Sequence, residues 1–113
     1  MSRDRETLID IVAAIKLILH YVEGVDFDSL AANIEKQDAI LRRITIIGEA
    51  TKRLSKDFRE QHPNIPWKEI SGMRDVITHD YDEVDLDEVW TVVNTNLPDL
   101  LNYIEPLIAL GDI

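Results

Sequence analysis

Apolar residues recur along the chain at three- and four-residue spacing, which is the pattern of amphipathic helices. The first segment of this kind carries an apolar stripe made of Leu8, Ile11, Val12, Ile15, Leu19 and Val22. Asp4 can cap the start of the helix, and Gly24 can adopt the left-handed conformation that closes helices. We therefore expect a first helix that begins near Asp4 and stops at Gly24.

The middle of the chain carries two further helical patterns. Asp26 and Asp28 are candidate N-caps for a short helical turn that runs through Asn33. Apolar residues then follow a helical period from Glu35 to about Asp57, with basic residues on the other faces. This second long helix is the main element expected in the centre of the chain.

Glycine and proline divide the rest of the sequence. Gly48 lies inside the second long helix, where glycine costs about 1 kcal/mol relative to alanine, so we expect a close packing contact there. Pro66 suits the first turn of a third helix, which should fray near His79. Asp85 can cap a last helix, and Pro98 within that helix predicts a kink.

The fold class expected from these elements is all-α, an antiparallel helical bundle that forms one domain over residues 1–113. The apolar fraction of 45% and the charged fraction of 30% are typical of a soluble globular protein. The sequence has no cysteine, which excludes disulfides and thiolate sites and favours a reducing compartment. No signal peptide or membrane span is apparent, so we expect a cytoplasmic protein.

Two of the three histidines have simple structural explanations. His20 lies near the end of the first helix, where the helix dipole favours a cation. His62 precedes Pro63 in a loop, where we expect a solvated side chain. Neither histidine predicts a functional site.

The third histidine has polar groups of several kinds around it. Arg74, Asp75, His79 and Tyr81 bring a guanidinium, a carboxylate, an imidazole and a phenol into one short segment. Imidazole can accept and return a proton, and a fixed guanidinium can stabilise charge on a phosphate oxygen, which together suit metal-independent RNA cleavage. On an ideal helix Arg74 and His79 lie about 140° apart, so they converge only through the reach of the arginine or at an unwound helix end. A helix end with polar caps and no function is the alternative.

The same segment carries a resemblance to a known family. Residues Arg74 to Tyr81 resemble the Arg-x4-His-x-Tyr motif of the HepT-like toxins, members of the HEPN (higher eukaryote and prokaryote nucleotide-binding) superfamily. Other short sequence motifs that recur in that family occur in the expected order at Ile46–Leu54, Ile65–Trp67, Gly72–Asp75, Val84–Leu86, Val89–Trp90 and Leu97–Leu100. The similarity therefore extends over nearly the whole chain.

The resemblance implies the toxin of a HepT/MntA-type toxin–antitoxin module, a ribonuclease that needs no metal or other cofactor and acts as a homodimer or higher homo-oligomer. Arg74 and His79 would be the catalytic pair, contributed by both subunits to a cleft at the interface, with Asp75 as a polar helper. Tyr81 would be the regulatory position, because the MntA-like nucleotidyltransferase antitoxin attaches AMP to the tyrosine of this motif. An anionic nucleotide there would block the cleft and repel RNA phosphates.

The distribution of charge supports this function only in part. The net charge of −10 repels nucleic acid on average. A basic stretch either positions RNA phosphates or forms a solvated helix face, and its candidate RNA-binding residues are Arg42, Arg43, Lys52 and Arg53. The acidic run from Asp80 to Glu88 suits a basic surface on the antitoxin, a cation, or solvent.

Two other functions remain open from the sequence. The first is a non-catalytic HEPN module that binds a nucleotide or interacts with a nucleotidyltransferase without cutting RNA, which the acidic character favours. The second is a helical dimer that has no site at all. Growth arrest on expression, RNA cleavage and AMP on Tyr81 would distinguish the three.

Overall fold

The structure is a computed structural model that describes residues 3–78 and 83–111. Its elements are α1 (Asp4–Tyr21), α2 (Phe27–Ala31), α3 (Ile34–Lys52), α4 (Lys56–Gln61), α5 (Trp67–Ser71), α6 (Met73–Ile77), α7 (Leu86–Thr91), the π-helical segment η2 (Val92–Asn96) and α8 (Leu97–Leu110). Within the described residues there is no strand, and an isolated antiparallel bridge joins Thr78 to Val84. The expected all-α class is confirmed.

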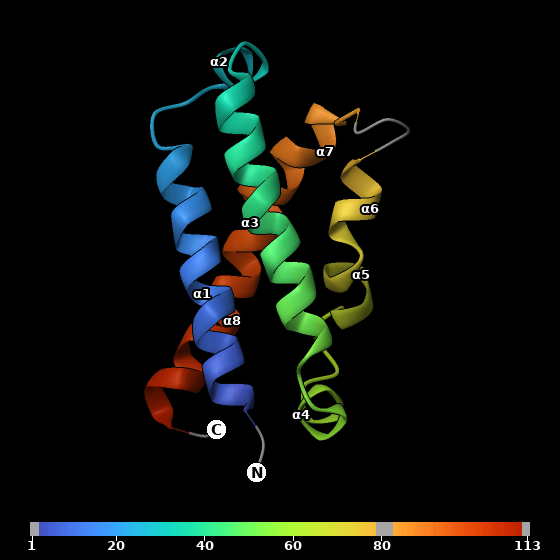
Figure 1. The fold of residues 1–113 in the computed structure, drawn as a ribbon. Coiled ribbons are helices and arrows are strands. Elements are labelled where there is room, and N and C mark those ends of the chain that lie inside the picture. The colour runs from blue at the N-terminus through green and yellow to red at the C-terminus, as the bar shows by residue number, and fades with distance from the viewer. Residues whose placement is uncertain (1–2, 79–82, 112–113) are drawn as a thin grey trace.

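The long helices form an antiparallel arrangement with α3 at its centre (Figure 1). Helix α1 runs beside α3 in the opposite direction and also packs against α8. The short helices α5 and α6 pack against α3 on the side away from α1 (Figure 1). The segment that leads to His79 is therefore supported by α3.

The core consists of the predicted apolar stripes. Most residues with at most 1% exposure come from three helices, and they include Leu8, Ile11, Ile15 and Ile18 of α1, Ile40, Ile44 and Ile47 of α3, and Leu97 and Ile104 of α8. Leu30 of α2, Ile77 of α6 and Val93 of η2 are buried to the same extent. Full burial of each such side chain contributes about 1.5–3 kcal/mol. Leu19 and Val22, expected in the first stripe, are only partly buried at its edge.

Gly48 makes the close contact that its position predicted. A Cβ atom at this residue would lie 3.1 Å from the backbone carbonyl oxygen of Ser71 in α5. That separation is tighter than ordinary van der Waals contact, so a side chain would push α5 away from α3. Glycine allows the two backbones to approach each other.

The second long helix ends at Lys52, so its expected extension to Asp57 was wrong. The chain leaves the helix after Lys52 because Ser55 caps a new helix, α4, by accepting a hydrogen bond from the Phe58 backbone N–H at 3.1 Å. Asp4 also does not cap its own helix, since the N-cap position of α1 is Arg3. The Asp4 carboxylate belongs to the junction of α3 and α4.

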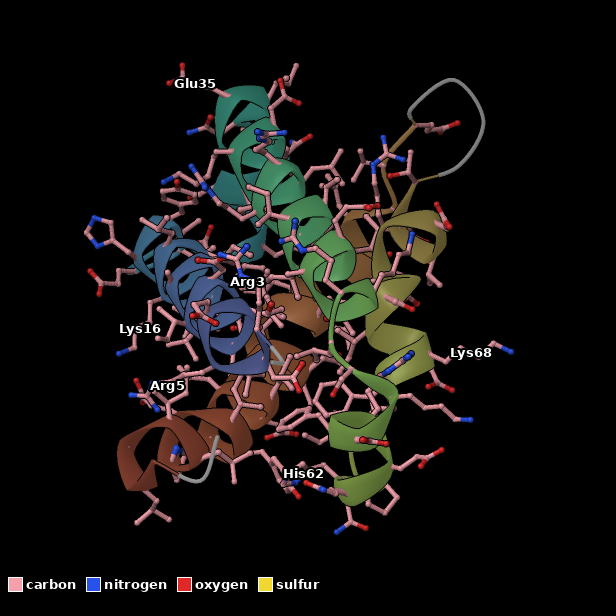
Figure 2. All side chains as sticks on the ribbon, turned by 60° about the horizontal axis from the view of Figure 1, so that its bottom comes forward. Arg3, Arg5, Lys16, Glu35, His62 and Lys68 are labelled. Atoms are coloured by element: carbon pink, nitrogen blue, oxygen red, sulfur yellow. The ribbon has the colours of Figure 1, made fainter. Side chains whose placement is uncertain are left out.

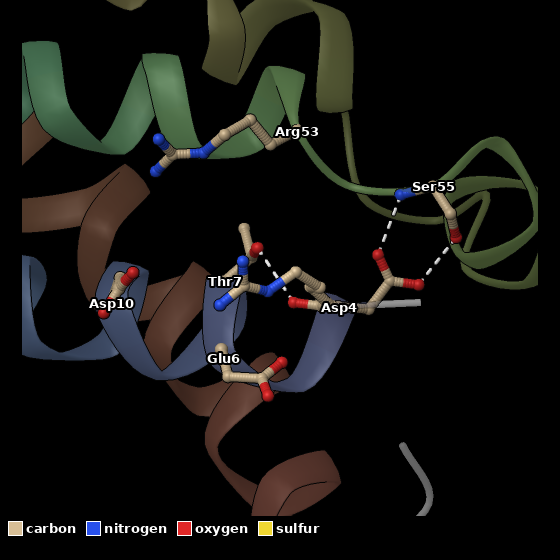
Figure 3. A pocket seen from close by; sticks show the side chains of 7 residues that line it. Asp4, Glu6, Thr7, Asp10, Arg53 and Ser55 are labelled. Carbon is tan, nitrogen blue, oxygen red and sulfur yellow. Dashed lines mark hydrogen bonds between the residues drawn. The ribbon is translucent and has the colours of Figure 1, made fainter. Parts of the chain in front are cut away.

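That carboxylate is 5% exposed and accepts two hydrogen bonds from one residue (Figure 3). Ser55 donates its backbone N–H to Oδ1 at 2.8 Å and its hydroxyl to Oδ2 at 2.6 Å. The same serine hydroxyl accepts from α4, so Asp4 ties the start of α1 to the start of α4. The contact spans 51 residues of sequence, and local patterns do not reveal it.

Of the predicted local caps, Asp26 and Asp85 are confirmed, whereas Asp28 lies inside the first turn of α2 and does not cap it. Asp26 caps α2 by accepting from the Ser29 backbone N–H at 2.8 Å, and this bond, with one from the Ser29 hydroxyl, holds the pKa of the Asp26 carboxyl below its usual value. Asp85 caps α7 by accepting from Glu88 N–H at 3.2 Å. Asn33 caps α3 rather than closing α2.

Two expected continuous helices are interrupted. The third helix divides at Gly72 into α5 and α6, each five residues long. The last helix contains the π-helical segment η2 directly before α8, whose first turn holds Pro98. Proline lacks the N–H that an α-helix would use at this point, which explains why the irregularity lies here. Of the helices that the structure describes, none is long and apolar enough to cross a membrane.

Candidate functional site

The candidate site begins on α6, which ends two residues before His79. Thr78 has extended backbone angles (φ −103°, ψ 123°), and its N–H donates to the Arg74 carbonyl oxygen at 2.9 Å. The helix therefore ends where fraying was expected. The objection that an ideal helix separates Arg74 from His79 does not apply, because the helix does not reach His79. His79 and Tyr81 themselves lie outside the described residues.

The backbone on either side of that undescribed segment is fixed. Thr78 forms an antiparallel bridge with Val84, and the Asp85 N–H donates to the Ile77 carbonyl oxygen at 2.7 Å. Asp85 then starts α7. Both flanks of the segment that carries His79 and Tyr81 are thus held at the end of α6.

Arg74 lies in a hollow between α6 and α3. The half-buried arginine lines a cavity of about 320 Å³ together with Asp38, Leu41, Arg42 and Thr45 of α3. Two guanidinium groups, Arg42 and Arg74, therefore border one cavity from facing helices. A pair of guanidiniums is well suited to hold a phosphate group, which each can bind with two hydrogen bonds.

Asp75 is exposed on the next position of α6. Successive helical residues point about 100° apart, so its side chain leaves the helix in a different direction from that of Arg74. Val76 is 59% exposed, which leaves an apolar side chain open on the same short helix. The surface around the motif therefore has a polar and an apolar component.

The four candidate RNA-binding residues do not form one surface. Arg42 lies beside Arg74, whereas Lys52 lines a separate cavity with residues of α4 and α5. Arg53 faces α1 and lines a third cavity with the carboxylate-bearing residues Asp10 and Glu6 (Figure 3). The helical period explains this separation, because adjacent positions such as 52 and 53 point in different directions.

Arg43 is partly buried, and its Nε atom has no hydrogen-bond partner among the described residues. It lies 100° along the helix from Arg42. The sequence therefore identified cations that are close to one another along the chain, but the structure brings only Arg42 to the cavity that Arg74 lines.

Of the two remaining histidines, His20 is where it was expected and His62 is not. His20 is exposed in the last turn of α1, with Nδ1 3.6 Å from Glu23 Oε2. His62 is partly buried: its ring centroid is 4.5 Å from that of Phe58, and Nδ1 is 3.1 Å from the Tyr103 hydroxyl (Figure 2). The spacing of four residues between Phe58 and His62 was the available signal, since such pairs meet on one helix face.

Among residues 3–78 and 83–111 no group of three His, Asp or Glu side chains is placed to hold a metal ion. The charged groups that line the cavity of Arg74 are the guanidiniums of Arg42 and Arg74 and the carboxylate of Asp38. The two guanidiniums can bind and stabilise an anionic phosphate, and the neighbouring sequence supplies an imidazole for proton transfer.

Comparison with known proteins gives a consistent result. A relative in Thermococcus cleftensis, named "Probable ribonuclease HepT", is 37% identical over 103 residues, which are 91% of this chain and 94% of the relative. A "Putative RNase" of Caldanaerobacter subterraneus subsp. tengcongensis is 33% identical over 108 residues, 96% of each chain. No solved structure matches the chain significantly. The model of the family described as "Ribonuclease HepT-like" matches residues 11–107, so this chain belongs to the HepT-like ribonuclease family.

Proposed function

We propose that the protein is a metal-independent RNA endonuclease and the toxin of a HepT/MntA-type module, with Arg74 and His79 as its catalytic pair. The observation that carries this proposal is the cavity where Arg74 and Arg42 meet, at the end of the helix that leads to His79. The relatives named as ribonucleases support the general activity. Asp75 is proposed as a polar helper beside Arg74.

The reaction uses the ribose 2′-hydroxyl as the nucleophile. Its oxygen attacks the adjacent phosphorus, the bond from phosphorus to the 5′-oxygen breaks, and the products are a 2′,3′-cyclic phosphate and a 5′-hydroxyl. An imidazole accepts the proton of the 2′-hydroxyl, and a proton is returned to the leaving 5′-oxygen. The guanidiniums of Arg74 and Arg42 stabilise the negative charge that builds on the phosphate oxygens.

We further propose that two copies of the chain assemble around this site. Val76, 59% exposed and two residues after Arg74 on α6, is an apolar residue that a second copy would cover. In a dimer one imidazole can accept a proton while the other donates one. Arg74 of one subunit would then act with His79 of its partner.

Tyr81 is proposed as the site of inhibition by an MntA-like nucleotidyltransferase. Attachment of AMP two residues from His79 would add an anionic group where the substrate phosphate must bind, and would repel it. The carboxylates of Glu83, Asp87 and Glu88 near the start of α7 give that partner an acidic surface to recognise.

The first experiment is cleavage of RNA in EDTA by freshly prepared protein whose intact mass shows no AMP. Wild-type protein should degrade the RNA, and His79→Ala and Arg74→Ala should lower the rate by about 10²–10⁴-fold, because proton transfer and charge stabilisation each contribute on this scale. Lys16→Ala, on an exposed part of α1 that forms an ion pair with Glu105, is the control and should retain wild-type activity.

Intact RNA after incubation with unmodified wild-type protein would overturn the proposal. The non-catalytic interaction module would then be the better description, and expression should not arrest growth. An AMP adduct on wild-type protein made together with a nucleotidyltransferase, absent from Tyr81→Phe, would support the proposed regulation.

A further inference from the structure

A basic hollow lies between the end of α3, helix α4 and helix α5. It has a volume of about 660 Å³, and its charged lining consists of Lys52, Lys56, Arg59, Glu60 and Lys68. The whole chain carries a net charge of −10, yet this hollow has four cations and one carboxylate. Positive charge therefore outweighs negative charge in this hollow, although the molecule as a whole is acidic.

The carboxylates around the hollow leave most of this charge available. Glu60 pairs with Lys56 at 3.8 Å, and Glu49 pairs with Lys52 at 3.4 Å, and all four side chains are well exposed. Exposed pairs of this kind are weak and are readily exchanged for another anion. Arg59 and Lys68 have no carboxylate within 4.0 Å among the described residues.

The cations stand on a fixed framework rather than on one solvated helix face. The hydrogen bonds of Ser55 with Asp4 and with the first turn of α4 hold this helix in place. Lys56 and Arg59 of α4 line the hollow together with residues of α5. Trp67, which is 9% exposed, forms part of the floor, and its Nε1 donates to the His62 carbonyl oxygen at 3.0 Å. Lys68 projects outward from α5 (Figure 2).

The hollow lies along the same side of α3 as the cavity of Arg74. Thr45 lines the Arg74 cavity and Lys52 lines the basic hollow, and these residues are seven positions, or two helical turns, apart on α3. Two turns correspond to about 10 Å and return to nearly the same face. A polymer bound at Arg74 can therefore continue into the hollow.

We propose that the basic hollow binds the phosphodiester backbone of the RNA strand, a few nucleotides from the bond that is cut. This inference rests on the proposed ribonuclease function and names a substrate contact outside the catalytic motif. The contacts are to phosphates, because Trp67 is too buried to stack on a base, so binding here is independent of sequence. Arg59 and Lys68 are the main contributors.

The test measures RNA binding separately from cleavage. In a His79→Ala background, fluorescence anisotropy with a labelled single-stranded RNA compares the double variant Arg59→Gln/Lys68→Gln with the control Arg3→Gln/Lys16→Gln. Both pairs remove two positive charges, but the control residues lie on the α1 side of the molecule (Figure 2). The test variant should bind on the order of tenfold more weakly. The slope of the logarithm of the binding constant against the logarithm of the salt concentration should become smaller in magnitude by about 1.4, for two lost phosphate contacts.

The control should bind as tightly as the parent protein. Equal weakening by both pairs would show that only net charge matters and would overturn the proposed hollow, as would unchanged binding by Arg59→Gln/Lys68→Gln. Failure of this inference can be told apart from failure of the proposed function. If wild-type protein cleaves RNA and the test variant binds RNA normally, only the proposed role of the basic hollow is overturned. If wild-type protein does not cleave RNA, the proposed ribonuclease function is overturned.

Discussion

At the scale of single residues, the hydrogen bonds that the sequence predicted are those made within one turn of helix. Asp26 and Asp85 cap the helices that follow them, and their partners lie three residues away. Asp4 looks like the same kind of cap but bonds to Ser55, because folding places that serine next to it. The spacing of residues in the sequence predicts caps within one helical turn, but it does not predict a contact between residues that only folding brings together.

The Asp4 carboxylate gives a test of this long-range contact. Asp4→Ala removes the acceptor of two hydrogen bonds and leaves the donors of Ser55 without it, which should lower the free energy of unfolding by about 2–3 kcal/mol. Thermal unfolding should show a midpoint lowered by roughly 10 °C or more. Asp10→Ala, an exposed acid that lines the same cavity, should change stability by less than about 0.5 kcal/mol. Equal effects of the two variants would show that Asp4 acts only through charge.

At the scale of elements, the helical period identified the buried faces and misplaced the ends. The core residues of α1 and α3 follow the expected stripes, since burial of one face is a property of the pattern itself. The breaks after Lys52 and at Gly72 come from capping by Ser55 and from packing of short helices on α3. Sequence periodicity continues across such breaks, so it does not locate them.

The close approach of α3 and α5 can be tested at Gly48. Gly48→Ala gains about 1 kcal/mol of helix propensity, but its Cβ would lie 3.1 Å from the Ser71 carbonyl oxygen, and overpacking of this kind costs about 1–3 kcal/mol. Because the neighbour is backbone, we expect a net loss of stability, measured by urea unfolding. Ala13→Gly, at an exposed position of α1, should lose only the helix propensity of alanine, about 1 kcal/mol. A Gly48→Ala protein more stable than wild type would show that α5 shifts to accommodate the methyl group at little cost in free energy.

At the scale of the whole molecule, charge was the property least predictable from the sequence. A single basic stretch of the chain is divided among the cavity of Arg74, the basic hollow and the acidic cavity beside α1. Lys68 joins the basic hollow from a different part of the sequence. The motif from Arg74 to Tyr81 was recognisable because it is local, whereas its neighbour Arg42 depends on how α6 packs against α3.

Assembly is the other property of the whole molecule. Val76→Glu would place a charge in the proposed dimer contact, so light scattering after gel filtration should show a monomer, and RNA cleavage should fall together with assembly. Ile9→Glu, at an apolar residue 44% exposed on α1, is the matched control and should stay dimeric and active. A Val76→Glu dimer with full activity would place the interface elsewhere.

The shortness of α6 has a further consequence. A five-residue helix does not form alone in water, because the cost of nucleating it exceeds what so few hydrogen bonds return. Its folded state therefore depends on the burial of Met73 and Ile77 against the rest of the core. If Arg74 binds a phosphate as proposed, that ligand would favour the ordered helix by mass action, whereas local opening of α6 would take the arginine out of its cavity and expose Ile77.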